Sequence, residues 1–191
     1  MLYVIRHGQT ARNKAKVLQG HYDEPMNQEG FAQARAAYER FVAAGLRFDK
    51  VYTSPLQRAI QTAQIVAPGV PQVVDARLIE IDCGPYEGMD LLAPAPEVIA
   101  FFRDFRNVPA PEGMESLESI IARMGAFLAD VHDEALDANI LVSTHGVAMR
   151  GALECLEAGS AGNSWSKRIV NCAVFVSEAL PAGGWSAPEE W

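Results

Sequence analysis

The sequence is poor in cysteine and has no long hydrophobic run. Its 191 residues contain three cysteines, Cys83, Cys155 and Cys172, which are too few and too scattered for a disulfide framework or a zinc site. No stretch approaches the ~18 continuous apolar residues of a membrane span. No basic segment leads into an apolar run with a cleavage site, as it would in a signal peptide. We therefore expect a cytoplasmic protein.

Positive charge is also scarce. The net charge is −8 at pH 7, which argues against a surface for nucleic acid or for an anionic membrane. Four cations, Arg6, Arg12, Lys14 and Lys16, nevertheless all precede the first acid, Asp23. This cluster fits either a local positive pocket for a small anion or a chance grouping on a solvated face. The charge pattern alone does not decide between the two.

The composition is ordinary for a soluble globular protein. Hydrophobic residues make up 49% of the chain and charged residues 21%, and there is neither an internal repeat nor a low-complexity tract. A chain of this length is long enough to bury a core without covalent staples. We therefore predict one domain over residues 1–191.

Apolar runs with the length of strands alternate with segments of helical periodicity. The pattern predicts strands at 2–5, 49–53, within 72–81, 140–143 and 173–177. It predicts helices at 28–44, 55–67 with Ser54 as N-cap, 96–106, 116–135 and 147–157. Such alternation is typical of a three-layer α/β/α fold with a mostly parallel central sheet. The proline-rich segment 82–115 is expected to be an insertion that folds over the sheet edge or the pocket, and the tail 180–191 to be irregular.

Three of the predicted strands end in polar residues. Arg6-His7-Gly8 follows the first, Ser54-Pro55 follows the second with Arg58 one turn later, and Ser143-Thr144-His145-Gly146 follows the fourth. Parallel strands have their carboxyl ends at one edge of the sheet, where open α/β sheets bind ligands. Two arginines and two histidines are therefore expected to meet there.

These side chains suit a phosphoryl group. Guanidinium groups present paired donors that match phosphate oxygens. A neutral imidazole can attack phosphorus and hold the group covalently, and a protonated one can donate to an equatorial oxygen. Gly8 and Gly146 remove a Cβ where the chain must pass close to a ligand. The spacing alone does not distinguish a phosphatase from a phosphate-binding module.

A leaving alcohol also needs a proton donor, and Glu80 is the natural candidate. It follows Leu78-Ile79, at the predicted end of the third strand. Its apolar neighbours favour the protonated carboxyl that a general acid needs near neutral pH. Asp82 and Glu87 are rivals within a few residues.

Taken together, the motifs resemble those of the histidine phosphatase superfamily, also called the phosphoglycerate mutase-like superfamily. The matching segments are RHGQT at 6–10 with Asn13, Gln19-Gly20 with Asp23, Pro25 and Gly30, SPLQRAIQTA at 54–63, LIEIDCGPYEG at 78–88, Glu115-Ser116 and STHG at 143–146. They occur in the family's order from residue 2 to about residue 175. Each motif is weak alone, and the set is highly specific.

The resemblance implies a role for each residue. His7 would be the nucleophile and become phosphohistidine. Arg6, Arg58 and His145 would hold the transferring phosphoryl group. Glu80 would protonate the leaving oxygen and then activate water. The remaining residues that would line the phosphate site are Gly8, Asn13, Gln19, Gly20 and Gly146. The resemblance implies a small phosphorylated substrate and inorganic phosphate as product, and it requires no metal or other cofactor.

Three functions stay open at this point. Mutases of the family usually have a longer chain and Arg-His-Tyr-Gly after the acid, whereas Ile81-Asp82-Cys83-Gly84 follows Glu80 here. This difference favours a metal-independent phosphomonoesterase acting on a small phosphorylated metabolite. The alternatives are a cofactor-dependent phosphoglycerate mutase and a non-catalytic module that binds phosphorylated ligands.

Some properties cannot be derived from the sequence. Cys83, Tyr86 and Met114 depart from the residues common in the family, which leaves substrate specificity open. A thiol at position 83 would make activity redox-sensitive if it were reactive, although a buried, inert thiol is the expectation. Neither the substrate nor dimerisation through a sheet edge follows from the sequence, and the share of Asp82 in proton transfer stays open.

Overall fold

The computed structural model describes residues 1–157 and 167–191, and these residues form a six-stranded sheet in the order β3-β2-β4-β1-β5-β6. The strands are β1 (Leu2–Arg6), β2 (Lys50–Thr53), β3 (Gln72–Val74), β4 (Ile140–Thr144), β5 (Val174–Ser177) and β6 (Glu189–Glu190). The first four strands in this order pair in parallel, and β5 and β6 add an antiparallel edge. The predicted α/β fold with a mostly parallel sheet is confirmed.

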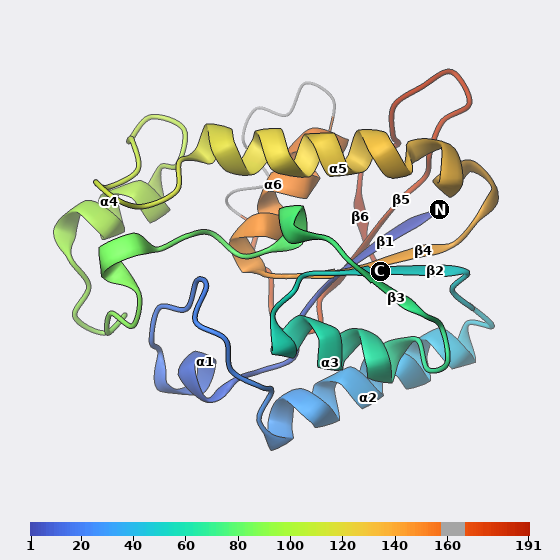
Figure 1. Ribbon diagram of the computed structural model, residues 1–191, viewed down its shortest axis with the longest axis horizontal. Coiled ribbons are helices and arrows are strands. Elements are labelled where there is room, and N and C mark those ends of the chain that lie inside the picture. The colour runs from blue at the N-terminus through green and yellow to red at the C-terminus, as the bar shows by residue number, and fades with distance from the viewer. Residues whose placement is uncertain (158–166) are drawn as a thin grey trace.

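Helices cover both faces of this sheet (Figure 1). They are α1 (Ala11–Ala15), α2 (Gln28–Ala43), α3 (Gln57–Val66), α4 (Pro96–Arg103), α5 (Leu117–Asp137) and α6 (Gly146–Leu156), with 3-10 turns η1 (Ala76–Leu78) and η2 (Gly84–Tyr86). Helices α2 and α3 lie on one face, and α5 and α6 on the other. In the part of the chain that the structure describes, no helix has the length and apolarity needed to cross a membrane.

The central strand β1 contributes to the cores on both faces. Leu2 and Val4 belong to the cluster beneath α5 and α6, and Tyr3 and Ile5 to the cluster beneath α2 and α3. Successive side chains of a strand point to opposite faces. A strand covered on both sides is therefore apolar throughout, as the run that precedes Arg6 is.

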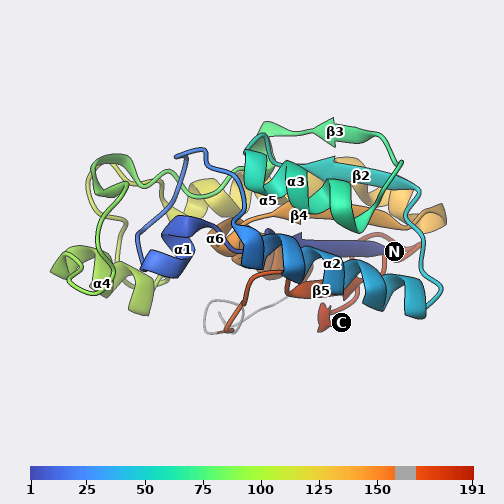
Figure 2. The ribbon, with the colours of Figure 1, turned by 90° about the horizontal axis from the view of Figure 1, so that it is seen from below.

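The carboxyl ends of the parallel strands face α1 and α4 (Figure 2). Within the proline-rich segment, the chain at 88–91 pairs with the chain at 16–18, since Leu18 N donates to Met89 O at 2.8 Å and Gly88 N to Leu18 O at 3.0 Å. The segment 82–115 thus packs against the loop that follows α1. It lies on the same side of the sheet as the predicted phosphate site.

Two predicted boundaries are wrong, and both concern site residues. The third strand ends at Val74, and the side chain of Asp75 caps a 3-10 turn by accepting from Arg77 N at 2.8 Å. Glu80 therefore lies in a loop beyond this turn rather than at a strand end. Helix α3 begins at Gln57 after the N-cap Leu56, and the Ser54 hydroxyl, which precedes the helix, accepts from Leu56 N at 3.3 Å and contacts His145.

The tail is more regular than predicted. Residues Glu189–Glu190 pair with β5 as strand β6. The Trp191 ring then stacks on Phe41 of α2, with ring centroids 4.4 Å apart. The C-terminal residues are thereby attached to the same core cluster as Tyr3 and Ile5.

Candidate functional site

The histidines that follow β1 and β4 lie beside each other. These strands are parallel neighbours in register, with Arg6 opposite Thr144, and His7 N donates to Thr144 O at 2.9 Å. The His7 and His145 rings consequently have centroids 5.0 Å apart. Both side chains are buried.

Arg58 joins them from the first turn of α3. Its Nε donates to His145 Nδ1 at 3.1 Å, and its other nitrogens donate to the carbonyls of Gly20 at 2.7 Å and Tyr22 at 2.8 Å. The side chain is fully buried. These bonds use three of the five N–H donors of a guanidinium.

The contacts of His145 define its protonation state. Arg58 can only donate, so Nδ1 of His145 accepts and the ring carries its proton on Nε2. This Nε2–H donates to the Ser54 hydroxyl at 2.7 Å. Burial, reinforced by the charge of Arg58, lowers the pKa of His145 well below its usual range. His145 is therefore a neutral imidazole.

His7 is held in the other tautomer. Its Nδ1 lies 2.7 Å from the carbonyl oxygen of Gly8, which can only accept, so the proton is on Nδ1 and Nε2 keeps its lone pair. Burial, and then the charges of Arg58 and Arg6, lower the pKa of His7 well below its usual range. A neutral ring with an unprotonated Nε2 is the nucleophilic form of histidine.

The depressed pKa values of His7 and His145 predict a loss of stability in acid. Below the ordinary histidine pKa of about 6.5, the unfolded chain binds one more proton at each ring than the folded chain. The free energy of unfolding should therefore fall with pH by about 1 kcal/mol per pH unit for each ring, down to the folded-state pKa. Urea unfolding between about pH 7.5 and pH 5.5 measures this slope.

His145→Asn isolates the contribution of one ring. Other titrating groups are the same in both proteins, so the variant should lose about 1 kcal/mol per pH unit of the wild-type slope. Equal slopes for the variant and the wild type would contradict the assignment of His145 as a buried neutral ring.

Arg6 presents an unsatisfied donor to the same region. Its Nη1 donates to Ile169 O at 2.7 Å, whereas its buried Nε has no hydrogen-bond partner within residues 1–157 and 167–191. A Cβ built on Gly146 would lie 3.5 Å from Arg6 Nε and 3.6 Å from Glu80 Oε2. Gly146 is thus flanked by the cation and the carboxylate. A buried donor without a partner costs about 1–3 kcal/mol, and an anion at this position would recover that cost.

Glu80 is bound to the N-terminus of α6. Its Oε1 accepts from the backbone N–H groups of Val147, Ala148 and Ile81, each at 3.0 Å. The apolar setting expected from the sequence is thus replaced by backbone donors at the N-terminus of α6. The side chain is buried and fixed beside Arg6.

The rival acids lie in different surroundings. The carboxylate of Glu87 pairs with Arg12 at 3.1 Å and accepts from Gly20 N at 3.0 Å. The side chain of Asp82 is 56% exposed and lies 4.0 Å from His21. Of these three acids, Glu80 alone is buried at the start of α6.

The glycines of the site serve packing more than ligand access. A Cβ on Gly8 would come within 2.5 Å of Gly30 O, and Gly8 N donates to the Thr62 hydroxyl at 3.0 Å. Gly20 donates to Glu87 and accepts from Arg58, as described above. At Gly146 a Cβ would meet only ordinary van der Waals contacts. The expectation that Gly8 leaves room for a ligand is therefore replaced by close packing against α2.

Asn13 and Gln19 belong to the polar network around the loop that carries His7. Asn13 Oδ1 accepts from Thr10 N at 3.3 Å, and Gln19 Oε1 accepts from the Thr10 hydroxyl at 2.8 Å. Asn171 donates to Asn13 Oδ1 at 3.2 Å and to His7 O at 3.0 Å. The structure thus connects both predicted residues to Thr10, Asn13 through its backbone and Gln19 through its hydroxyl.

Three residues that form hydrogen bonds with the site were not identified as its partners from the sequence. Ser54 was predicted as a helix cap but binds His145, and Thr62 binds Gly8. Both lie in the segment 54–63, so the spacing in the motif was the available signal. Asn171 lies just before β5, and only the antiparallel direction of that strand brings it to the carboxyl end of β1.

The comparison with known proteins decides the family. The model of the histidine phosphatase superfamily (branch 1) matches residues 2–186. The chain belongs to this superfamily. The resemblance seen in the sequence is thereby confirmed.

Curated relatives of this chain are named as mutases. The 2,3-bisphosphoglycerate-dependent phosphoglycerate mutase of Brucella melitensis is 33% identical, over 99% of this chain and 96% of the relative. The mutase of the same name from Brucella canis is 32% identical with the same coverage. This chain covers 96% of each of these relatives, so chain length gives little ground for separating it from them.

Similar solved structures are named as phosphatases. The mycobacterial glucosyl-3-phosphoglycerate phosphatase has a TM-score of 0.83 at 24% identity and covers 100% of this chain and 97% of its own. The phosphoserine phosphatase of Entamoeba histolytica, solved with 3-phosphoglyceric acid, has a TM-score of 0.79 at 24% identity and covers 99% and 93%. At this identity the likeness shows a shared fold.

Proposed function

We propose that this histidine phosphatase is a cytoplasmic, metal-independent phosphomonoesterase that hydrolyses a small phosphorylated metabolite through a phosphohistidine on His7. The observation that carries the proposal is the placement of four groups at one edge of the sheet. They are the neutral His7, the guanidinium groups of Arg6 and Arg58, and the buried carboxyl of Glu80. Together they supply a nucleophile, charge stabilisation and a proton carrier.

The first step transfers the phosphoryl group to the enzyme. The Nε2 lone pair of His7 forms the bond to phosphorus while the bond to the leaving oxygen breaks. Arg6 and Arg58 stabilise the charge on the phosphoryl oxygens. Glu80 enters this step protonated and gives its proton to the leaving oxygen. In this proposal His145 Nε2–H turns from the Ser54 hydroxyl to a phosphoryl oxygen.

The second step releases phosphate. The carboxylate of Glu80 takes a proton from a water molecule, and the water oxygen forms the new bond to phosphorus. The bond between phosphorus and Nε2 breaks, which returns the electron pair to His7, and the proton taken from water leaves Glu80 protonated for the next cycle. Phosphate leaves, and the site is restored.

A phosphoglycerate mutase is the second candidate, because the Brucella relatives have that name. A mutase must also hold the carboxylate of phosphoglycerate, which requires further cations or hydrogen-bond donors near the phosphate. Directly after Glu80, this chain has the buried Ile81 and the acid Asp82 instead. That difference supports transfer of the phosphoryl group to water rather than back to a phosphoglycerate.

Two assays test the proposal together. Phosphate release is measured from p-nitrophenyl phosphate and from a panel of phosphorylated metabolites, all in the presence of EDTA. A coupled assay follows interconversion of the 2- and 3-phosphoglycerates with added bisphosphoglycerate. We expect hydrolysis with EDTA and no interconversion. Interconversion faster than hydrolysis would establish the mutase, and tight phosphate binding without turnover would establish a binding module.

Replacing Arg6 should weaken phosphate binding. Arg6→Met removes the unsatisfied Nε donor, and a lost charge-assisted hydrogen bond reduces affinity by about 10-fold or more. Phosphate raises the melting temperature of the wild-type enzyme by binding the folded state, and the variant should need correspondingly more phosphate for the same rise. A thermal-shift titration measures this, and unchanged titration curves would exclude Arg6 from the anion site.

A further inference from the structure

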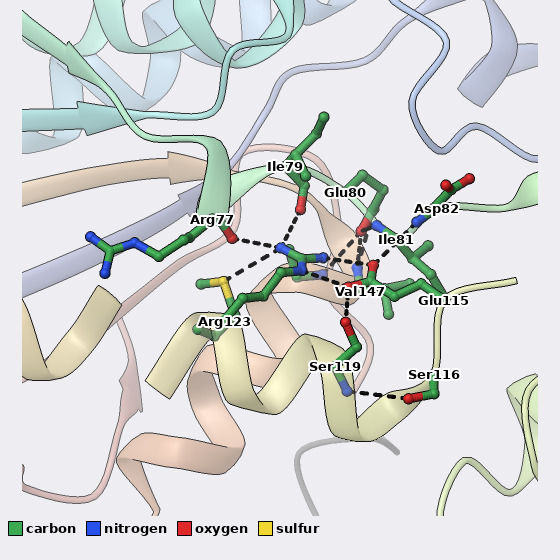
Figure 3. Close-up of polar contacts among 12 residues, drawn as sticks. Arg77, Ile79, Glu80, Ile81, Asp82, Glu115, Ser116, Ser119, Arg123 and Val147 are labelled. Carbon is green, nitrogen blue, oxygen red and sulfur yellow. Dashed lines mark hydrogen bonds and ion pairs between the residues drawn. The ribbon is translucent and has the colours of Figure 1, made fainter. Parts of the chain in front are cut away.

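We propose that Arg123 and Glu115 are positioning residues for Glu80, which they hold by binding the backbone on both sides of it (Figure 3). The inference rests on the proposed function, since it assigns the pair to the proton transfer carried out by Glu80. Neither side chain contacts the Glu80 carboxyl in Figure 3, so they act through the main chain.

The loop that carries Glu80 needs support from outside itself. It lies between η1, which ends at Leu78, and η2, which begins at Gly84. A general acid must lie within hydrogen-bond reach of its target. A displacement of about 1 Å costs on the order of 100-fold in rate. A proton donor on a loop therefore requires contacts that fix the loop.

Arg123 holds the residues before Glu80. It lies on the second turn of α5, and its Nη1 donates to Arg77 O and to Ile79 O, both at 2.6 Å. Other side chains hold the adjacent carbonyls, because the Thr144 hydroxyl donates to Leu78 O at 2.7 Å and His21 Nε2 lies 2.9 Å from Glu80 O.

Glu115 binds the backbone of Asp82, two residues after Glu80. Its Oε2 accepts from Asp82 N at 3.2 Å, and its own backbone N donates to Asp82 O at 2.8 Å. The main chain is thus held at Ile79 and at Asp82, with Glu80 between them.

An ion pair connects Arg123 to Glu115, so the two side chains support the loop together. Arg123 Nε and Nη2 donate to the two carboxylate oxygens of Glu115 at 2.8 and 3.1 Å. A bidentate pair fixes orientation as well as distance, and the side chains are only 15% and 13% exposed. Burial alone would raise the pKa of Glu115, but the bonds from Arg123 and Ser119 lower it overall, so the pair is ionised.

The rigid partner is helix α5. It is 21 residues long, and its buried Ile120 and Met124 flank Arg123 in the core. The pair therefore connects the Glu80 loop to a helix that is packed on the sheet. The carboxyl of Glu80 is fixed separately to α6 by Val147 and Ala148.

The test compares leaving groups. p-Nitrophenolate leaves without needing a proton, whereas the alkoxide of an alkyl phosphate such as glycerol phosphate does need one. In Arg123→Met we expect kcat/KM to fall by about 10-fold or more for the alkyl phosphate and by less than about 3-fold for p-nitrophenyl phosphate. Arg123→Lys keeps a donor for the carbonyls and should restore part of the loss.

Asp130→Asn is the matched control. It removes the ion pair between Asp130 of α5 and Arg77 Nη1 of η1, which are 2.6 Å apart, and leaves the bonds to Ile79 and Asp82 intact. Its ratio of the two kcat/KM values should equal that of the wild type. Glu115→Gln weakens the pair without removing its shape and should shift the ratio in the same direction as Arg123→Met.

The outcomes separate the two proposals. Equal losses on both substrates, or no loss in Arg123→Met and Glu115→Gln, would overturn the positioning role. A melting temperature near the wild-type value shows that a variant is folded. If Arg123→Met does not fold, the ratios of Arg123→Lys and Glu115→Gln decide. A wild-type protein that hydrolyses neither substrate would reject the proposed function, and the positioning role with it.

Discussion

His7→Ala should abolish turnover, with kcat lower by at least about 10⁴-fold, because removing a covalent nucleophile eliminates the phosphoenzyme route. Arg6 and Arg58 remain in the variant, so phosphate binding should persist. The loss is therefore expected in kcat rather than in affinity. Phosphate release from p-nitrophenyl phosphate measures the rate, and a thermal-shift titration with phosphate measures binding.

A quench experiment tests the intermediate directly. The wild-type enzyme, mixed with labelled substrate and stopped in alkali, should retain label on His7, and His7→Ala should retain none. His132→Ala is the matched control, since His132 lies on α5 and contacts Gly184 and Trp185, away from the His7–His145 pair. It should keep both the label and the turnover. Full activity in His7→Ala would refute the mechanism.

Glu80→Gln should separate substrates by their leaving groups. Glutamine keeps an oxygen that can accept from Val147 and Ala148, so the geometry at α6 is preserved. It has no proton to transfer, and the loss of general acid–base catalysis lowers the rate by about 10²–10⁴-fold for an alkyl phosphate. For p-nitrophenyl phosphate the first step should change little.

The second step should then become visible. Without a base to activate water, the phosphoenzyme accumulates, and p-nitrophenol should appear in a burst of one equivalent followed by slow release. Stopped-flow absorbance records both phases. Asp82→Asn tests the rival acid, whose exposed side chain contacts Gly84 N. If Asp82→Asn and not Glu80→Gln produced the burst, the proton carrier would be Asp82.

The burial of the cysteines bears on whether the protein is redox-sensitive. Cys83 is fully buried, and burial raises the pKa of its thiol far above the usual range. Burial likewise raises the pKa of Cys172 to about 12. Reactive cysteines depend on an accessible thiolate. The two buried thiols therefore fit the expectation of inert packing, and a redox switch at Cys83 is not supported.

Local sequence patterns specify the sheet and the residues at its edge. The apolar runs before Arg6 and Ser143 are typical of strands covered on both faces, and alternation with helices predicts parallel pairing. Parallel strands end at one edge, so the sequence alone predicts that His7, Arg58 and His145 converge. The structure brings these three together, and the family match agrees with the order of the motifs.

How these groups are held depends on contacts between segments that are distant in the sequence. The tautomers of His7 and His145 depend on Gly8 O and Arg58 Nε, and the setting of Glu80 depends on α6, 67 positions away. Arg123 reaches Ile79 across 44 positions. Periodicity and capping patterns report on neighbours within one turn or one strand. Hydrogen bonds between distant segments depend instead on how the helices pack on the sheet, which such local patterns do not contain.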